Sequence, residues 1–331
     1  MHGEDMKLVV FSTVLALLFS LALLYATFEV PLLVRELLLP IFPDYSHGTW
    51  NGARAFLEMF RPVGYVAFIV TLALIVTGFA LKRTNITRLG SFLAFLPTFG
   101  YFACTMFFLA GIGILRLPLL PIMDASRSLL ALGNAVFLPL IVVIGLPLIL
   151  IHWTAGISVV SIPIAEVLVW FGSFIFFLGV VAWLYGRMKG AELVDFWIYR
   201  YSRHPQYLGF LIWSYGLLVH ASLIGAPMGG YVPPPSLPWL IVALAIIAVA
   251  LREENIMVEK FGESYMQYRR KTPFLLPLPK KITSLITAPV SFIFKKDVPE
   301  NGKEIALTVA VYGLAIVVLS LPFNMIFPWW F

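Results

Sequence analysis

Long runs of apolar residues constrain this chain more than any other feature of its sequence. A helix needs about 20 consecutive apolar residues to cross the hydrocarbon part of a bilayer, and about eight runs come close to or exceed this length. Only 12% of the residues are charged, about half of the fraction in a typical soluble domain. The sequence therefore predicts an all-α, multi-pass integral membrane protein with about eight transmembrane helices. The expected spans are, at about these bounds, 8–29, 63–81, 90–115, 128–152, 162–186, 206–224, 237–251 and 304–327.

The net charge of +6 does not indicate a nucleic-acid partner. Most of the basic residues flank apolar runs, which is the usual pattern of Lys and Arg next to membrane spans. The single cysteine, Cys104, lies inside an apolar run, so neither an intramolecular disulfide nor a thiolate metal cluster is expected. The histidines outside the motif described below are scattered, and we expect no metal site at His2, His47, His152 or His220.

The distribution of basic residues between the runs predicts the orientation in the membrane. The segment 187–205 contains four Lys or Arg residues and the segment 252–303 contains ten, whereas the loops 153–161 and 225–236 contain none. Because loops rich in Lys and Arg stay in the cytosol, both basic segments are expected on the cytosolic side. The basic loop 82–88 falls on the outer side in this scheme and disagrees with it.

Three regions follow from this arrangement. Residues 1–160 form an N-terminal membrane region of about four helices, with a short amphipathic helix expected at about 54–60. Residues 161–280 contain the motifs that carry chemistry. Residues 281–331 form a linker and one additional transmembrane helix.

The first of these motifs is YRYSRHPQYLGF, from Tyr199 to Phe210, at the start of the sixth run. Pro205 suits the first turn of a helix, and the free backbone amides of a helix start attract carboxylates and phosphates. Gly209 permits close approach of a ligand or another helix. The alternative interpretation is a basic membrane anchor with tyrosines at the interface.

The second motif is the pair Glu253 and Glu254 at the end of the seventh run. Two carboxylates are costly against lipid, so they are expected to face solvent, a cationic group or a ribose diol. The pair begins an amphipathic helix that leaves the membrane, is interrupted near Gly262, and ends before Pro273. On this helix Glu254 lies on the same face as apolar residues, which places it inward, with Glu253 nearer the edge.

Together the two motifs resemble the isoprenylcysteine carboxyl methyltransferase and phospholipid methyltransferase superfamily. Members of this superfamily carry an Arg-His-Pro-x-Tyr-x-Gly stretch, a later Glu-Glu pair, and then Phe-Gly-x-x-Tyr-x-x-Tyr followed by proline. The matching residues here are Arg203, His204, Pro205, Tyr207, Gly209, Glu253, Glu254, Phe261, Gly262, Tyr265, Tyr268, Pro273 and Pro277.

The resemblance covers about 162–280 and implies that these residues surround S-adenosylmethionine at the cytosolic face, with a lipophilic substrate entering from the bilayer. Members often have an arginine four residues before the Glu-Glu pair, where this chain has Val249; Arg252 is the nearest substitute. The residues expected to be catalytic are Arg203 and Arg252, and those expected to bind the cofactor are Arg203, His204, Pro205, Tyr207, Gly209, Glu253, Glu254 and Tyr265.

The expected partners are a lipophilic small molecule or lipidated substrate and membrane lipids. The methyl acceptor stays open between a carboxylate, an amine and a thiol, and so does the oligomeric state. One alternative is an NADPH-dependent reductase of the sterol or steroid type, because such proteins share a similar Arg-His-Pro-x-Tyr-x-Gly stretch. A transporter or scaffold is disfavoured, because Glu166 is the main acidic residue within the runs.

Overall fold

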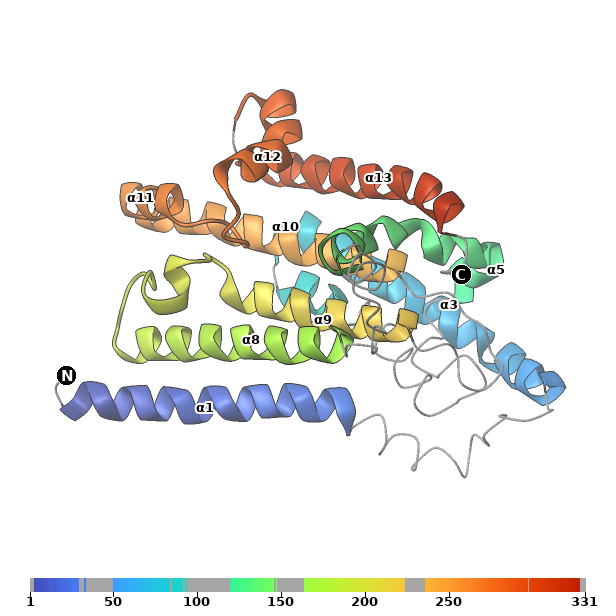
Figure 1. The fold of residues 1–331 in the computed structure, drawn as a ribbon, viewed down its shortest axis with the longest axis horizontal. Helices are drawn as coiled ribbons and strands as arrows, with labels where there is room; N and C mark the ends of the chain where they lie inside the picture. The colour runs from blue at the N-terminus through green and yellow to red at the C-terminus, as the bar shows by residue number, and fades with distance from the viewer. Residues whose placement is uncertain are drawn as a thin grey trace. The chain divides into compact units, whose positions relative to one another are not determined.

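The chain is described by a computed structural model in which every regular element of the described residues is a helix (Figure 1). The structure describes residues 3–29, 33, 50–83, 85–91, 93, 120–145, 147, 164–223, 236–296 and 298–327. The α-helices are α1 Gly3–Phe28, α3 Trp50–Ala80, α5 Leu120–Ala125, α6 Leu138–Leu140, α8 Ile164–Met188, α9 Pro205–Leu223, α10 Ser236–Phe261, α11 Glu263–Lys271, α12 Lys280–Phe294 and α13 Gly302–Ile326. The other elements are the 3₁₀-helices η2 Arg127–Phe137 and η4 Trp197–Arg200 and the π-helix η3 Ile141–Gly145.

The predicted all-α membrane fold is confirmed. Five helices, α1, α3, α8, α10 and α13, are long and apolar enough to cross a bilayer, and α9 coincides with the sixth expected span. The expected span at 90–115 lies largely outside the described residues. The described part of the span expected at 128–152 is a succession of 3₁₀-, α- and π-helix, not one regular α-helix.

Two helices extend beyond the ranges that hydropathy predicts. The seventh span was expected at 237–251, but α10 continues without a break to Phe261. The amphipathic helix expected at about 54–60 is not separate, because α3 runs from Trp50 through the second span. Hydropathy detects only the lipid-facing part of a helix, whereas the backbone hydrogen bonds continue into polar turns outside the hydrocarbon.

The chain divides into two compact units, which we describe separately. Unit 1 comprises Met1–Val30, Leu168–Ser214 and Ile246–Val311, and unit 2 comprises Pro31–Val167, Tyr215–Ala245 and Tyr312–Phe331.

In unit 1, α1 packs lengthwise against α8 (Figure 1). Ala16 of α1 is buried together with Val180 and Val181 of α8. At one end of the pair, the ammonium group of Lys189 lies 3.1 Å from the carboxylate of Asp5. The N-terminal helix is thus joined to the helix that precedes the first motif.

Two glycines allow α8 and α9 to approach at backbone distance within unit 1. A Cβ atom added at Gly209 would lie 2.4 Å from the backbone nitrogen of Phe176, and one added at Gly172 would lie 2.3 Å from that of Trp213. Both distances are shorter than side chains tolerate, so the two helices can pack this closely only with glycine at these positions. The close packing holds the first turns of α9, and with them the end of the first motif, against α8.

We expect Gly209→Ala to separate α8 from α9 and to lower the free energy of unfolding by about 1–3 kcal/mol, the usual cost of inserting an atom into a filled site. Gly302→Ala is the matched control, because no described atom lies within 4 Å of a Cβ atom there. Thermal unfolding in detergent would compare the two variants with the natural protein. An unchanged midpoint for Gly209→Ala would show that the helices adjust without cost.

Unit 2 contains a buried polar network around η2. The hydroxyl of Ser236 donates to the side-chain oxygen of Asn134 at 2.6 Å and lies 2.9 Å from the carbonyl oxygen of Leu130. The side chain of Asn134 also donates to Asn324 at 3.1 Å. Because both Asn134 and Ser236 are fully buried, these bonds satisfy groups that would otherwise be costly in an apolar interior.

Candidate functional site

The first motif lies at the start of α9, within unit 1. Pro205 is the first residue of α9, as predicted. The backbone N–H of Arg203 donates to the carbonyl oxygen of Pro273 at 3.0 Å, and that of His204 donates to the hydroxyl of Ser202 at 3.3 Å. The bond to Pro273 holds the residues before the helix against the segment that follows α11, and the bond to Ser202 fixes the turn into the helix.

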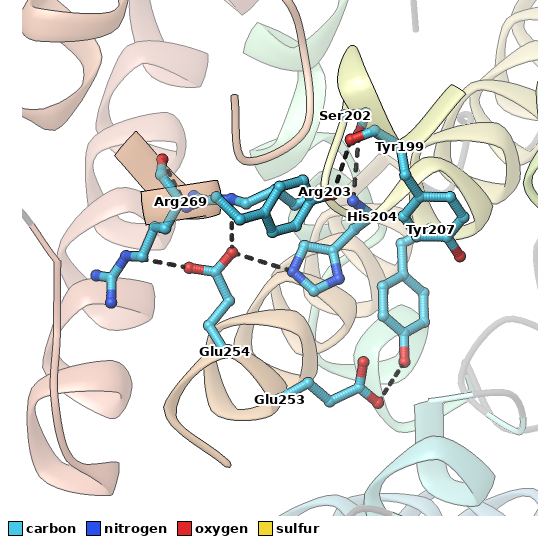
Figure 2. Close-up of polar contacts among 9 residues, drawn as sticks. Tyr199, Ser202, Arg203, His204, Tyr207, Glu253, Glu254 and Arg269 are labelled. Atoms are coloured by element: carbon cyan, nitrogen blue, oxygen red, sulfur yellow. Dashed lines mark hydrogen bonds and ion pairs between the residues drawn. The ribbon is translucent and has the colours of Figure 1, made fainter. Parts of the chain in front are cut away.

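A buried ion cluster centres on Glu254 of α10, which has no exposed surface (Figure 2). Its Oε1 lies 2.8 Å from Nε of Arg203 and 3.3 Å from Nε2 of His204. Its Oε2 lies 3.5 Å from Nε of Arg269 on α11. Arg203 also donates from Nη1 to the backbone carbonyl of Arg269 at 3.2 Å. The cluster therefore joins the segment before α9 to α10 and α11.

The charges in this cluster do not cancel. Two guanidinium groups, which stay charged in proteins, face the single carboxylate of Glu254. Burial lowers the pKa of Arg203, and the nearby Glu254 carboxylate opposes that effect. The interior of the site is consequently suited to an anionic group of a ligand.

Two atoms of the cluster have unused hydrogen-bonding capacity. Nε of Arg203 and Oε2 of Glu254 are buried, and among the described residues their ion-pair contacts at 2.8 and 3.5 Å lack hydrogen-bond geometry. Buried polar atoms are nearly always paired in folded proteins. A ligand that carries both an acceptor and a donor would satisfy the guanidinium and the carboxylate together.

The neighbouring carboxylate, Glu253, has different surroundings. The hydroxyl of Tyr207 donates to its Oε1 at 2.8 Å (Figure 2), and the ring of Tyr207 lies near the ring of His204, with centroids 5.7 Å apart. Adjacent residues of a helix point about 100° apart. The prediction that Glu254 faces inward and that the two carboxylates differ in surroundings is confirmed; their binding roles stay predictions.

Two tyrosines of α11 extend the site. Tyr265 and Tyr268 are buried, with ring centroids 5.8 Å apart, and the hydroxyl of Tyr268 donates to the carbonyl oxygen of Tyr199 at 2.7 Å. Burial raises the pKa of both hydroxyls, and the carboxylate of Glu254 raises that of Tyr265 further. Both groups are therefore protonated at neutral pH and can donate hydrogen bonds.

Phe274, in the segment after α11, covers the cationic end of the cluster. Its ring meets the ring of His204 edge to face with centroids 5.2 Å apart. The guanidinium carbon of Arg203 lies 5.8 Å from the centre of the same ring, which is within the range of a cation–π contact. The aromatic ring limits access of water to the charged groups.

The structure thus brings together most of the residues predicted for the site. Arg203, His204, Tyr207, Glu253, Glu254 and Tyr265 lie around the cluster, and Pro205 begins the helix that supports it. Gly209 was expected to permit close approach of either a ligand or another helix. In the structure it lies where α8 packs against α9. Arg252 is half-buried on α10 beside the carboxylate pair. The predicted cofactor contact of Gly209 and the predicted catalytic role of Arg252 stay predictions.

Sequence reasoning missed Arg269. The signal that could have identified it is its spacing, because Arg269 follows Tyr265 by four residues and Tyr268 by one on a helix whose tyrosines face inward. No group of three or more His, Cys, Asp or Glu side chains in the described ranges is arranged to hold a metal ion.

Comparison with known proteins finds a matching family and a matching curated relative. Residues 186–272 match the model of a family described as a protein of unknown function, DUF1295. The chain is also 37% identical over 93 residues to the protein-S-isoprenylcysteine O-methyltransferase of Schizosaccharomyces pombe. This match covers 28% of the chain and 36% of that relative, so the chain aligns with about a third of the length of the curated relative. No solved structure matches the chain.

The family match falls on the segment that contains the two motifs, and both matches support the superfamily resemblance that the motifs predict. The N-terminal helices and α13 lie outside the family match.

Proposed function

We propose that this protein is an S-adenosylmethionine-dependent methyltransferase of the membrane that acts on a lipophilic acceptor bearing a carboxylate or an amine. The observation that carries the proposal is the buried cluster of Arg203, Glu254 and Arg269, which has excess positive charge and unused hydrogen-bonding atoms. The similarity to a relative named as a methyltransferase supports the same reaction class.

The residues of the cluster fit the chemical groups of the cofactor. The two arginines suit its carboxylate, because a guanidinium forms charge-assisted hydrogen bonds with that group. The Oε2 of Glu254, which lies 3.5 Å from Arg269 and has no hydrogen bond in good geometry among the described residues, suits the amino group or a ribose hydroxyl. The faces of Tyr207 and Tyr265 suit an adenine ring or a sulfonium cation.

The protein's part in such a reaction is mainly alignment and exclusion of water. S-adenosylmethionine supplies an electrophilic methyl group on a sulfonium. The network of Arg203, His204 and Glu254 holds three side chains in fixed positions, and Phe274 lies over two of them. Holding reacting groups in an attack geometry lowers the barrier of a displacement substantially.

The site is proposed to face the cytosol. The segment 252–303 contains ten Lys or Arg residues, and it includes Glu253, Glu254, Arg269 and Phe274. A lipophilic or lipidated acceptor would then reach the site from the cytosolic leaflet.

The direct test is ligand binding by the purified protein in lipid nanodiscs. We expect saturable binding of S-adenosylhomocysteine, and S-adenosylmethionine in native mass spectra of the purified protein. Binding of NADPH, with no binding of S-adenosylhomocysteine, would overturn the proposal and favour the reductase alternative. Lipid analysis of cells with and without the protein would then identify the acceptor as a species heavier by one methylene.

The bond between Tyr207 and Glu253 gives a further prediction about the same site. We expect Glu253→Gln to weaken S-adenosylhomocysteine binding by about tenfold or less. Glutamine can still accept a hydrogen bond from Tyr207, so the change removes only the charge assistance of that bond, about 1 kcal/mol. Tyr207→Phe should cause a similar loss, and the double variant should lose less than the sum of the two losses. Fully additive losses would show that the two side chains contribute independently.

A further inference from the structure

Helix α12 has an unusual length and composition for a helix outside the site. Its 15 residues run from Lys280 to Phe294, and most of it is an apolar helix too short to count as a span. At a rise of about 1.5 Å per residue it is about 22 Å long, whereas the hydrocarbon core is about 30 Å thick. Helix α12 therefore cannot cross the bilayer by itself.

The face of α12 that points away from the protein is the apolar one. Val290 is buried, and Thr287, Ser291 and Phe294, which share its side of the helix, are partly buried. The remaining large apolar side chains are exposed, including Leu285 at 75% and Phe292 at 88%. The exposed apolar face consists of Ile282, Leu285, Ile286, Phe292 and Ile293.

Both ends of α12 carry groups that require water or lipid headgroups. Lys281 is exposed at the start. After the helix, Lys296 lies 2.5 Å from Glu300, and the side chain of Asn301 accepts hydrogen bonds from the backbone of Lys303 and Glu304 at 3.1 and 3.0 Å. The charged turn between α12 and α13, in which Asn301 caps the start of α13, places the end of α12 at the aqueous surface. The exposed Lys281 places the start of α12 there as well.

The segment that leads into α12, and α12 itself, carry charge of one sign, whereas beyond them Lys296 is paired with Glu300 and Glu304. Lys281 and Lys295, both exposed, are therefore the lysines that can meet lipid headgroups. From Arg269 to Lys296 the chain contains seven Lys or Arg residues and no Asp or Glu. Basic residues beside an apolar helix face bind anionic lipid headgroups. A second copy of the chain would present the same positive charge and would be repelled by it.

We propose that α12 lies in the plane of the membrane, with its apolar face inserted at the boundary of the acyl chains and its flanking lysines bound to anionic phospholipid headgroups. The partner is an anionic lipid surface. This inference does not depend on the proposed enzymatic reaction.

The position of α12 links this surface to the candidate site. Phe274 contacts His204 and Arg203 and precedes the start of α12 by six residues. An in-plane α12 would hold these residues at the level of the headgroups, where a polar cofactor and a lipid acceptor can both reach them.

The first test measures the depth of single residues of α12. In a Cys104→Ser background, a fluorescent label is attached at Ile286→Cys, Phe292→Cys or Ser284→Cys, and brominated lipids in nanodiscs serve as quenchers. Residues 284 and 286 point about 160° apart on a helix, so Ser284 is the matched control. We expect strong quenching at 286 and 292 and weak quenching at 284.

The second test concerns headgroup charge. We expect emission from the label at 286 to shift further to the blue in nanodiscs that contain phosphatidylserine than in those of phosphatidylcholine alone. Lys281→Gln/Lys295→Gln should remove this difference, whereas Lys82→Gln/Arg83→Gln, which removes the same charge elsewhere, should keep it. Equal emission in both lipids for the natural sequence would overturn the anionic-lipid assignment.

The third test concerns the side of the membrane. Cysteines at Lys281 and Lys303 should react with an impermeant reagent from the same side, because an in-plane α12 does not cross the bilayer. Reaction from opposite sides would show that α12 spans the membrane and would overturn the proposal. Equal quenching at 284 and 286 would overturn it as well.

Discussion

Glu254→Gln is expected to be the most damaging single substitution in the site. Glutamine keeps the size of the side chain but removes the charge that opposes Arg203 and Arg269, which lie 2.8 and 3.5 Å from the carboxylate. Removing one partner of a buried ion pair typically costs about 3–5 kcal/mol of stability. We also expect affinity for S-adenosylhomocysteine to fall by about tenfold or more, equivalent to about 1.4 kcal/mol.

Glu253→Gln is the matched control for this prediction, since it makes the same chemical change at the adjacent position. Glu253 is only partly buried and accepts a hydrogen bond from the neutral hydroxyl of Tyr207. Its substitution should therefore shift the thermal unfolding midpoint less. Equal midpoints for the two variants would contradict the central role of Glu254 in the cluster.

A charge-compensating variant separates lost charge balance from lost shape. Arg203→Gln/Glu254→Gln removes one positive and one negative charge together. If unopposed charge causes the loss in Glu254→Gln, the double variant should be more stable than the sum of the two single effects. Its cofactor binding should stay weak, because both proposed ligand groups are absent.

Local patterns in the sequence predicted the boundaries near the site well. Pro205 as the first residue of α9 follows from the fixed backbone angle of proline, and the break at Gly262 follows from its positive φ of 53°. The inward face of Glu254 follows from helical spacing alone. Each of these features depends on residues within one or two helical turns.

The features that the sequence did not reveal depend on residues far apart in the chain. Arg203 and Arg269 are 66 residues apart and meet through Glu254, and no local pattern encodes that contact. The succession of 3₁₀-, α- and π-helix after Arg127 is similarly hidden, because hydropathy is the same for all three geometries. In unit 2 the contacts of Asn134 with Ser236 and Asn324 cross more than 100 positions.

The two arginines of the cluster are expected to contribute unequally, and Arg203→Ala should have the larger effect. Arg203 is the more buried of the two, with 7% of its side chain exposed against 16% for Arg269. Its guanidinium also makes the shorter contact with Glu254, at 2.8 Å against 3.5 Å for Arg269. A charged hydrogen bond to a ligand carboxylate is worth about 1.5–3 kcal/mol, so affinity for S-adenosylhomocysteine should fall by about 10- to 150-fold.

Arg203→Ala should affect stability less than Glu254→Gln does, because Arg269 remains to balance the carboxylate of Glu254. Arg203→Lys keeps the charge but lacks the fork that reaches both Glu254 and the carbonyl oxygen of Arg269. We therefore expect it to recover stability more than affinity. Titration of each purified variant, with Arg269→Ala as the comparison, measures the order of these effects. If Arg203→Ala binds as tightly as the natural protein, Arg203 supports the fold only, and the carboxylate of the cofactor must be held elsewhere.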